Sequence, residues 1–387
     1  MRRAGQQLRI TAQLTSTEDG RLLWSQRYDR RVADVLEIQD ELARTIVGTL
    51  RATSFADLAA PPVRRHTDSE RAYRLYLKGR YEWNRRTRAG VAAGIRYFEQ
   101  AIAEDPSYAL AYTGLADCYA LEVDYRSIPV HEGFAKAEEY ARRAIALDDT
   151  LAEAHTSLAW SLFAYDWEWE EAAREFRRAI ECDPRYATAH QWYAFSLASR
   201  GALDEALVEG HTAVELDGGS VSARRSLGWA YYYARRHADA RYHLDRAIAM
   251  DPNAEESYRT LGLVLAVDGE ADEATRVLEE ASAMEGAGSY TRATLGYALA
   301  RGGRADEARA LLAELDALAA RGYVSPVAFA TLYLGLGDVE RALDWTERAL
   351  EARRGWLAYL RVNPIMDPMR GHPRFDALLT RMRLRDA

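Results

Sequence analysis

The chain has 387 residues, of which 48% are hydrophobic and 28% charged, and its formal net charge is −8. This composition is typical of a folded protein and argues against a chain that is disordered over most of its length. The negative charge gives no support to a nucleic-acid partner, whose binding usually needs a basic face or stripe.

The first fifty residues carry a strand pattern followed by a helix pattern. Apolar and polar residues alternate in LRITAQLTST from Leu8 and again in LLWSQRYD, with EDG between them, which predicts a β-hairpin. VLEIQDELARTIVGTL then places Val35, Ile38 and Leu42 at helical spacing, which predicts an amphipathic helix. The stretches AQLTSTEDGRLLWSQRYDR and VLEIQDELA resemble the closing hairpin and helix of the TolB-like N-terminal domain of bacterial signalling proteins. Residues 1–52 are therefore expected to form part of such an α/β domain.

From Glu99 onward, one phrase of eighteen residues recurs along the chain. Copies such as EQAIAEDPSYALAYTGLA and DRAIAMDPNAEESYRTLG begin at residues 99, 142, 177, 211, 245 and 279. The intervals between them are 43, 35, 34, 34 and 34 residues. A period of this length is the signature of a solenoid built from helix pairs.

The unit from Val221 to Pro252 shows how one repeat is expected to fold. SARRSLGWAYYYARR and HADARYHLDRAIAMDP each carry an apolar stripe at helical spacing, and RRHAD predicts the turn between them. Gly228 and Ala240 are small enough for the two helices to pack closely. Pro252 ends the second helix because it has no N–H donor and disfavours helical geometry in the residue before it. The chain is therefore expected to be all-α after its first segment.

The order of residue types in each unit resembles the tetratricopeptide repeat: aromatic, Leu, Gly or Ala and Tyr, then Ala, Phe or Leu, Ala and Pro. The resemblance implies a right-handed superhelical solenoid of about eight helix-turn-helix units over residues 69–354, after a linker at residues 53–68. Nine extra residues, YRSIPVHEG at 125–133, predict a loop that is either simply tolerated or part of a working face. The tail VNPIMDPMRGHPRFDALLTRMRL resembles the segment that closes such arrays, so residues 355–387 are expected to cap the last repeat.

In tetratricopeptide proteins the first helix of each unit lines a concave groove, and the resemblance assigns ten residues of this chain to that groove. Aromatic residues and Arg are enriched at interface hot spots, which favours partner binding there. The alternative is that some of these side chains pack between neighbouring repeats. The ten groove residues are Thr156, Trp160, Phe163, Gln191, Phe195, Arg225, Trp229, Tyr232, Arg259 and Tyr297.

No catalytic or metal-binding constellation is found in the sequence. Walker loops, dinucleotide fingerprints, nucleophile elbows and zinc helices do not occur, and Cys118 and Cys182 are too few for a zinc site. His155 and His190 share one repeat position, which indicates a structural role in the repeat. DWEWEEA at residues 166–172 carries four carboxylates that could serve glycoside hydrolysis, but acidic residues also favour a helix N-terminus. We expect no enzyme activity, no cofactor and no metal.

The sequence therefore favours a non-catalytic scaffold that binds a protein or peptide in bacterial signalling or regulation. The longest apolar run, PVAFATLYLGLG, is shorter than the roughly 20 residues that cross a bilayer, so we expect a cytoplasmic protein. The alternative is the C-terminal regulatory or sensory region of a larger adenylate-cyclase, kinase or winged-helix regulator, because the resemblance implies that such arrays follow these output domains. A glycan-processing enzyme is a third reading, which rests on the carboxylates alone.

Overall fold

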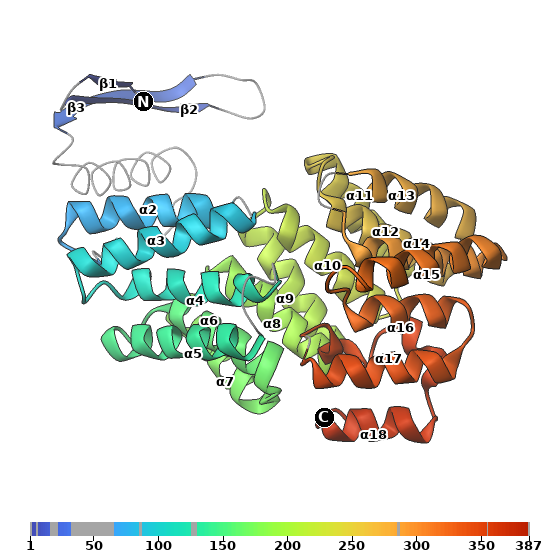
Figure 1. Cartoon of the computed structure of the whole chain (residues 1–387). Coiled ribbons are helices and arrows are strands. Elements are labelled where there is room, and N and C mark those ends of the chain that lie inside the picture. The colour runs from blue at the N-terminus through green and yellow to red at the C-terminus, as the bar shows by residue number, and fades with distance from the viewer. Residues whose placement is uncertain are drawn as a thin grey trace. The chain divides into compact units, whose positions relative to one another are not determined.

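The structure is a computed structural model, and two compact units divide the chain, Met1–Gly114 and Leu115–Ala387. Helices make up most of the described part after residue 66 (Figure 1). The described residues are 2–4, 7–15, 22–31, 66–84, 87–124, 130–284, 287–353 and 355–385.

The Met1–Gly114 unit begins with three strands: β1 (Arg2–Ala4), β2 (Gln7–Thr15) and β3 (Leu22–Arg31). They form one antiparallel sheet in the order β1-β2-β3, and the register changes near the end of β2. The helix expected over residues 35–50 and most of the expected linker lie outside the described residues. The assignment of this segment to a TolB-like domain stays a prediction.

The helices of this unit pack around one aromatic ring. α2 (Glu70–Asn84) and α3 (Arg88–Glu104) form a pair, and α4 (Ala109–Asp124) begins in this unit. Phe98 of α3 is fully buried and fills the space that two glycines leave open. A Cβ atom added at Gly79 or at Gly114 would lie 2.5 Å from Phe98 Cε1. Glycine at these two positions therefore allows the helices to approach one another around the ring.

The Leu115–Ala387 unit repeats one helix pair. It starts with the rest of α4 and with α5 (Val130–Leu147), so Val130–Gly133 begin a helix and are not part of the loop expected at 125–133. The first helices of the pairs are α6 (Ala152–Ser161), α8 (Ala187–Ser199), α10 (Val221–Tyr233), α12 (Glu255–Asp268), α14 (Ser289–Arg301) and α16 (Pro326–Gly335). The second helices are α7 (Trp169–Cys182), α9 (Leu203–Leu216), α11 (His237–Met250), α13 (Ala271–Ala283), α15 (Ala305–Ala319) and α17 (Val339–Glu351).

A glycine in the first helix lets each central pair close. A Cβ atom at Gly228 of α10 would lie 2.8 Å from Leu244 Cγ of α11 and 3.5 Å from the carbonyl of Ala240. Gly262 holds the same place one period later, where Leu278 of α13 fills the space. The close packing predicted at Gly228 and Ala240 is confirmed, with a buried leucine as the main neighbour.

The interval of 35 residues in the repeat has a local structural cause. α6 and α7 start at Ala152 and Trp169, one residue further apart than the starts of α8 and α9 at Ala187 and Leu203. The π-helical turn η2 (Leu162–Asp166) follows α6, and a π turn is the usual way for a helix to hold one extra residue. The next residue, Trp167, is left-handed with φ 58° and redirects the chain into α7.

Two histidines tie the first helix of a pair to its second helix and to the turn before the pair in the same way. His155 Nδ1 lies 2.6 Å from Glu175 Oε2, and its Nε2 lies 3.0 Å from the Asp149 carbonyl oxygen. His190 makes the same pair of contacts, with Glu209 at 2.5 Å and the Pro184 carbonyl at 3.0 Å. All of these partners accept hydrogen bonds, so both ring nitrogens donate when the imidazole is protonated. The structural role predicted for these two histidines is confirmed.

The pKa values of these histidines make the contacts within each helix pair sensitive to pH. The hydrogen bond with Glu209 raises the pKa of His190 above its ordinary value and outweighs the effect of burial. Burial lowers the pKa of His155, but the hydrogen bonds with Glu175 and Asp149 outweigh it, and the net shift is also upward. A raised folded-state pKa stabilises the fold at pH values below the unfolded-state pKa, and this contribution is lost as pH rises through the folded-state pKa.

The His190→Gln variant is therefore expected to lose more stability at pH 6 than at pH 9. The loss at pH 6 should be on the order of 1–3 kcal/mol, the scale of a buried hydrogen bond to a charged group. Thermal and urea melts at both pH values measure it. Glu209→Gln is the matched variant, because it removes the carboxylate from the same pair and should give the same pH dependence. Equal losses at the two pH values would contradict the assignment.

Candidate functional site

The chain after α17 returns to helices of much earlier repeats. η3 (Gly355–Tyr359) contacts η2 and α8, η4 (Pro364–Met369) contacts α16 and α17, and α18 (Pro373–Arg381) packs on α17. We call residues 355–385 the returning segment. The sequence predicts only a cap on the last repeat, and the segment does more than that because it also packs against η2 and against the ends of the first helices α8 and α10.

Polar contacts fix the middle of the returning segment to α10. The hydroxyl of Tyr232 donates to Asn363 Oδ1 at 3.0 Å, and both residues are fully buried. The guanidinium of Arg235 donates to both carboxylate oxygens of Asp367 at 2.6 Å. Two parallel charge-assisted bonds of this kind are stronger and more directional than a single one. The segment is therefore held at a defined place on the repeat array.

Three aromatic residues around the π turn contact the chain just before the same segment and near its end. Trp169 Nε1 donates to the Met382 carbonyl at 2.8 Å in a buried position. The guanidinium of Arg353, which is the last described residue before the segment, lies 5.2 Å from the ring centre of Tyr165 and 5.1 Å from that of Trp167. The extra residue in this repeat therefore places its aromatic side chains where the segment begins and ends.

The carboxylates of the stretch 166–172 have structural partners. Glu168 pairs with Arg383 at 2.8 Å, and Glu170 pairs with Arg200. Burial, with added repulsion from Glu138, raises the pKa of Asp166 to about 6. Glu168 and Glu170 therefore serve ion pairs of the fold, in agreement with the structural interpretation of this stretch.

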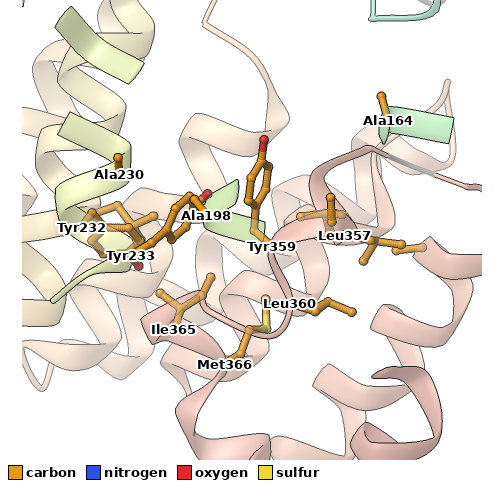
Figure 2. Close-up of a cluster of buried hydrophobic side chains, with 14 of the residues drawn as sticks. Ala164, Ala198, Ala230, Tyr232, Tyr233, Leu357, Tyr359, Leu360, Ile365 and Met366 are labelled. Atoms are coloured by element: carbon orange, nitrogen blue, oxygen red, sulfur yellow. The ribbon is translucent and has the colours of Figure 1, made fainter. Parts of the chain in front are cut away.

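Six aromatic rings form a continuous row across three repeats and the returning segment. Each contacts the next through its ring, and in the fourth of the five contacts Tyr359 stacks on Tyr233 with ring centres 5.0 Å apart. Figure 2 shows Tyr359 beside Tyr233, in the same cluster as Ile365 and Met366. We call the set the aromatic row, and in order it consists of Trp192, Trp160, Phe195, Tyr359, Tyr233 and Trp229.

The two ends of the aromatic row and Phe195 are partly exposed, whereas Tyr359 and Tyr233 are buried. Trp160 and Trp192 contact each other with ring centres 4.8 Å apart, and both keep part of their surface in solvent. At the other end Trp229 stacks on Tyr233 at 5.5 Å and is also partly exposed. Tyr233 and Tyr359 are only 3% and 9% exposed, so the returning segment covers the middle of the row.

The charged residues beside the row balance one another. Arg225 pairs with Glu256 at 2.8 Å, and Arg259 lies 3.6 Å from Glu255 and 4.0 Å from Glu256. The guanidinium of Arg259 also lies 5.0 Å from the ring centre of Tyr290. A carboxylate from a partner would have to compete with these glutamates for either arginine.

The structure changes the expected role of four of the ten groove residues. Thr156, Phe163, Tyr232 and Tyr297 are 1%, 1%, 0% and 6% exposed and belong to the interior. Thr156 bonds to the Ala152 carbonyl of its own helix at 2.7 Å, and Phe163 lies between Trp169 and Tyr359. The other six, which remain partly exposed on the first helices, are Trp160, Gln191, Phe195, Arg225, Trp229 and Arg259.

Tyr297 is buried by a neighbour that the repeat pattern does not predict. Gly335 of α16 packs directly on it, and a Cβ atom there would lie 2.7 Å from Tyr297 Cα. Gln191, in contrast, stays at the surface and uses its amide nitrogen to donate to the hydroxyls of Ser222 at 3.0 Å and Ser226 at 2.8 Å. This neutral hydrogen-bond bridge joins α8 to α10 next to Trp192.

The sequence interpretation missed three members of the row: Trp192, Tyr233 and Tyr359. Trp192 follows the predicted Gln191 directly, and an approximate helical register does not separate adjacent positions. Tyr359 lies outside the repeats, so no periodic signal marks it. Among the residues that the structure describes, no group of three or more His, Cys, Asp or Glu side chains is arranged to hold a metal ion. Within the same residues, no helix combines the length and apolarity needed to span a membrane.

Residues 211–255 and 225–289 match a tetratricopeptide repeat family model. These ranges run from the end of α9 through α13 to the start of α14. The chain therefore carries tetratricopeptide repeats, and the predicted repeat type is confirmed in this part.

Two curated relatives and one solved structure illustrate what the chain is similar to. It is 28% identical over 163 residues to Putative adenylate cyclase 3 of Rhizobium meliloti (strain 1021), with 42% of this chain and 28% of that relative covered. It is 25% identical over 159 residues to Transcriptional regulator HilA of Salmonella typhimurium, with 41% and 29% covered. The match therefore spans less than a third of either relative. A tetratricopeptide repeat protein from Parabacteroides merdae superimposes with a TM-score of 0.47 at 13% identity, over 69% of this chain and 100% of that one.

Proposed function

We propose that this chain with its tetratricopeptide repeats is a non-catalytic scaffold of the bacterial cytoplasm, which binds a protein or peptide segment in signalling or regulation. The binding face would be the partly exposed surface of the first helices at the two ends of the aromatic row. The observation that carries the proposal is the row itself, because it brings large, rigid rings from three repeats onto one surface. Such rings supply contact area at little cost in conformational entropy and are enriched at hot spots.

The Trp229→Ala variant is expected to weaken partner binding by about 2 kcal/mol or more, which is roughly thirtyfold. A partner is first recovered from a lysate of the source organism with the wild-type chain and identified, and its affinity for each variant is then measured by calorimetry. Tyr242→Ala is the matched control, because Tyr242 is an aromatic residue that is 60% exposed on the second helix α11.

Stability has to be measured alongside binding, because Trp229 also stacks on Tyr233. Trp192→Ala, at the other end of the row, gives an independent variant. If both tryptophan variants melt like the wild type and bind the partner with unchanged affinity, the face is not used and the proposal fails. If Tyr242→Ala weakens binding as much as they do, the partner uses the second helices instead.

A second candidate is a regulatory region of a larger regulator. It is favoured by the match to Putative adenylate cyclase 3, which covers only 28% of that relative, so this chain resembles a part of a longer signalling protein. In this reading the scaffold would act on a cyclase, kinase or winged-helix output domain in the same polypeptide. The DNA upstream of the Met1 codon tests it. An in-frame output domain would support the candidate, and an in-frame stop codon directly before a ribosome-binding site would refute it.

A further inference from the structure

We propose that the exposed ends of the aromatic row select an extended, uncharged segment rich in proline and aliphatic residues, and that they discriminate against acidic tails. The inference rests on the proposed function, because it names the chemistry of the partner at the same face. Three observations carry it: the segment that already lies on the row, the geometry of the exposed rings and the balance of charge around them.

The chain already binds one segment of its own on this surface. Residues 357–369, LAYLRVNPIMDPM, contain two prolines, and most of their apolar side chains belong to the buried core cluster. Ile365 and Met366 are 1% and 0% exposed and lie in one cluster with Tyr232 and Tyr233 (Figure 2). The charged side chain of Asp367 stays exposed at the edge, where Arg235 pairs with it. The helix ends therefore accept an apolar, proline-containing segment and keep its charge at the rim.

The exposed rings continue this surface beyond the part that the returning segment covers. The ring centres of Trp160 and Trp192 lie 4.8 Å apart with their planes inclined by 39°, and both side chains are partly exposed. Proline-rich segments dock on aromatic surfaces of this kind, because their extended helix is already formed and loses little entropy on binding. A proline or aliphatic side chain placed against both rings would bury apolar surface on each of them.

The charges beside the row give no net attraction to an acidic or a basic partner. Near the Trp229 end of the row, two arginines and two glutamates pair with one another, Arg225 and Arg259 with Glu255 and Glu256. Gln191, next to Trp192, is neutral and already donates to two serine hydroxyls. A partner carboxylate would lose its hydration and would have to displace an existing pair, whereas an uncharged segment meets neither cost.

The test is a selection of random twelve-residue peptides displayed on phage against the full chain. We expect the enriched peptides to carry proline with Leu, Ile or Val and a net charge near zero. The consensus peptide is then synthesised, and its affinity is measured by calorimetry for the wild type, Trp160→Ala, Trp192→Ala and the control Tyr242→Ala. Each tryptophan variant should bind at least tenfold more weakly than the wild type, with Tyr242→Ala unchanged. Two Glu residues introduced into the peptide in place of aliphatic ones should weaken binding at least tenfold.

The outcomes separate this inference from the proposed function. An acidic or a basic consensus whose binding needs Trp160 or Trp192 would overturn the partner chemistry and leave the binding face in place. Selected peptides that bind the tryptophan variants as tightly as the wild type, or no enrichment at all, would overturn the inference, and the first of these results would also count against the face itself. Trp160→Phe, which keeps a ring, separates loss of contact from misfolding, because it should retain most of the affinity.

Discussion

Removal of residues 355–387 is expected to leave the Leu115–Ala387 unit without a cooperative unfolding transition. The returning segment buries many apolar side chains against at least three repeats, among them Leu357, Leu360, Ile365, Met366 and Met369, each no more than 1% exposed. Burial of a side chain of this size is worth about 1.5–3 kcal/mol. Their sum is on the order of the whole stability of a typical folded protein, about 5–15 kcal/mol. Circular dichroism melts and binding of a hydrophobic dye measure the effect.

A point variant tests the same contact with the segment still present. Tyr359→Ala removes a ring that contacts Phe163, Phe195 and Tyr233, and we expect it to cost about 3–5 kcal/mol, as for other buried aromatic truncations. Tyr359→Phe is the control, because it keeps every ring contact and should change stability by about 1 kcal/mol or less. If the deletion and Tyr359→Ala both melt like the wild type, the returning segment does not close the array.

The helix pairs could be predicted because their signal is local and repeated. Ala240, Leu244 and Ala247 lie on one stripe of α11, and all three are fully buried. Pro252 follows a helix that ends at Met250, as its chemistry requires. Periodicity carries this information because each pair packs on its neighbours through the same positions.

The return of the chain could not be predicted from the same signal. Residues 355–369 form two short 3₁₀ helices without a repeating apolar stripe, and their partners lie far away in the sequence. Tyr232 and Asn363, for example, are 131 residues apart. A pattern read within a window of one repeat cannot show a contact between residues this far apart. The sequence therefore predicts a cap on the last repeat but not its contacts with the earlier repeats.

The candidate face shows the same limit at the level of single residues. The register placed Trp160, Phe195 and Trp229 on the first helices with part of each ring in solvent, as the structure has them. It failed at Tyr232, which it assigned to the groove, because Tyr232 lies in a run with Tyr231 and Tyr233 where the three rings are 0%, 6% and 3% exposed. A helix with neighbours on all sides buries every face. Its sequence then has no polar stripe, so the periodic pattern cannot show which residues face the solvent.

Gly262→Ala is expected to destabilise the protein, although the same change in an ordinary helix stabilises it. Alanine is better than glycine in a helix interior by about 1 kcal/mol. At a helical glycine with no close neighbour, a change to alanine would therefore raise the free energy of unfolding. Gly262 lies in the middle of α12, where an added Cβ would overlap Leu278 Cγ of α13, and Leu278 is fully buried. Neither the backbone nor a packed leucine can move without opening the pair. We therefore expect a net loss of about 1–3 kcal/mol, the range for overpacking a core.

A double-mutant cycle decides between the steric argument and a general effect of the substitution. In a Leu278→Ala background the obstructing side chain is gone, so Gly262→Ala should there be neutral or stabilising, and the two changes should couple strongly. Gly322→Ala is a further control, because no atom lies within 4 Å of the Cβ position at that glycine. Urea unfolding of the four members of the cycle gives the coupling free energy. If the losses of unfolding free energy in the cycle are additive, Gly262 is not needed for the space that it leaves for Leu278. The close approach of the first and second helices would then need another explanation.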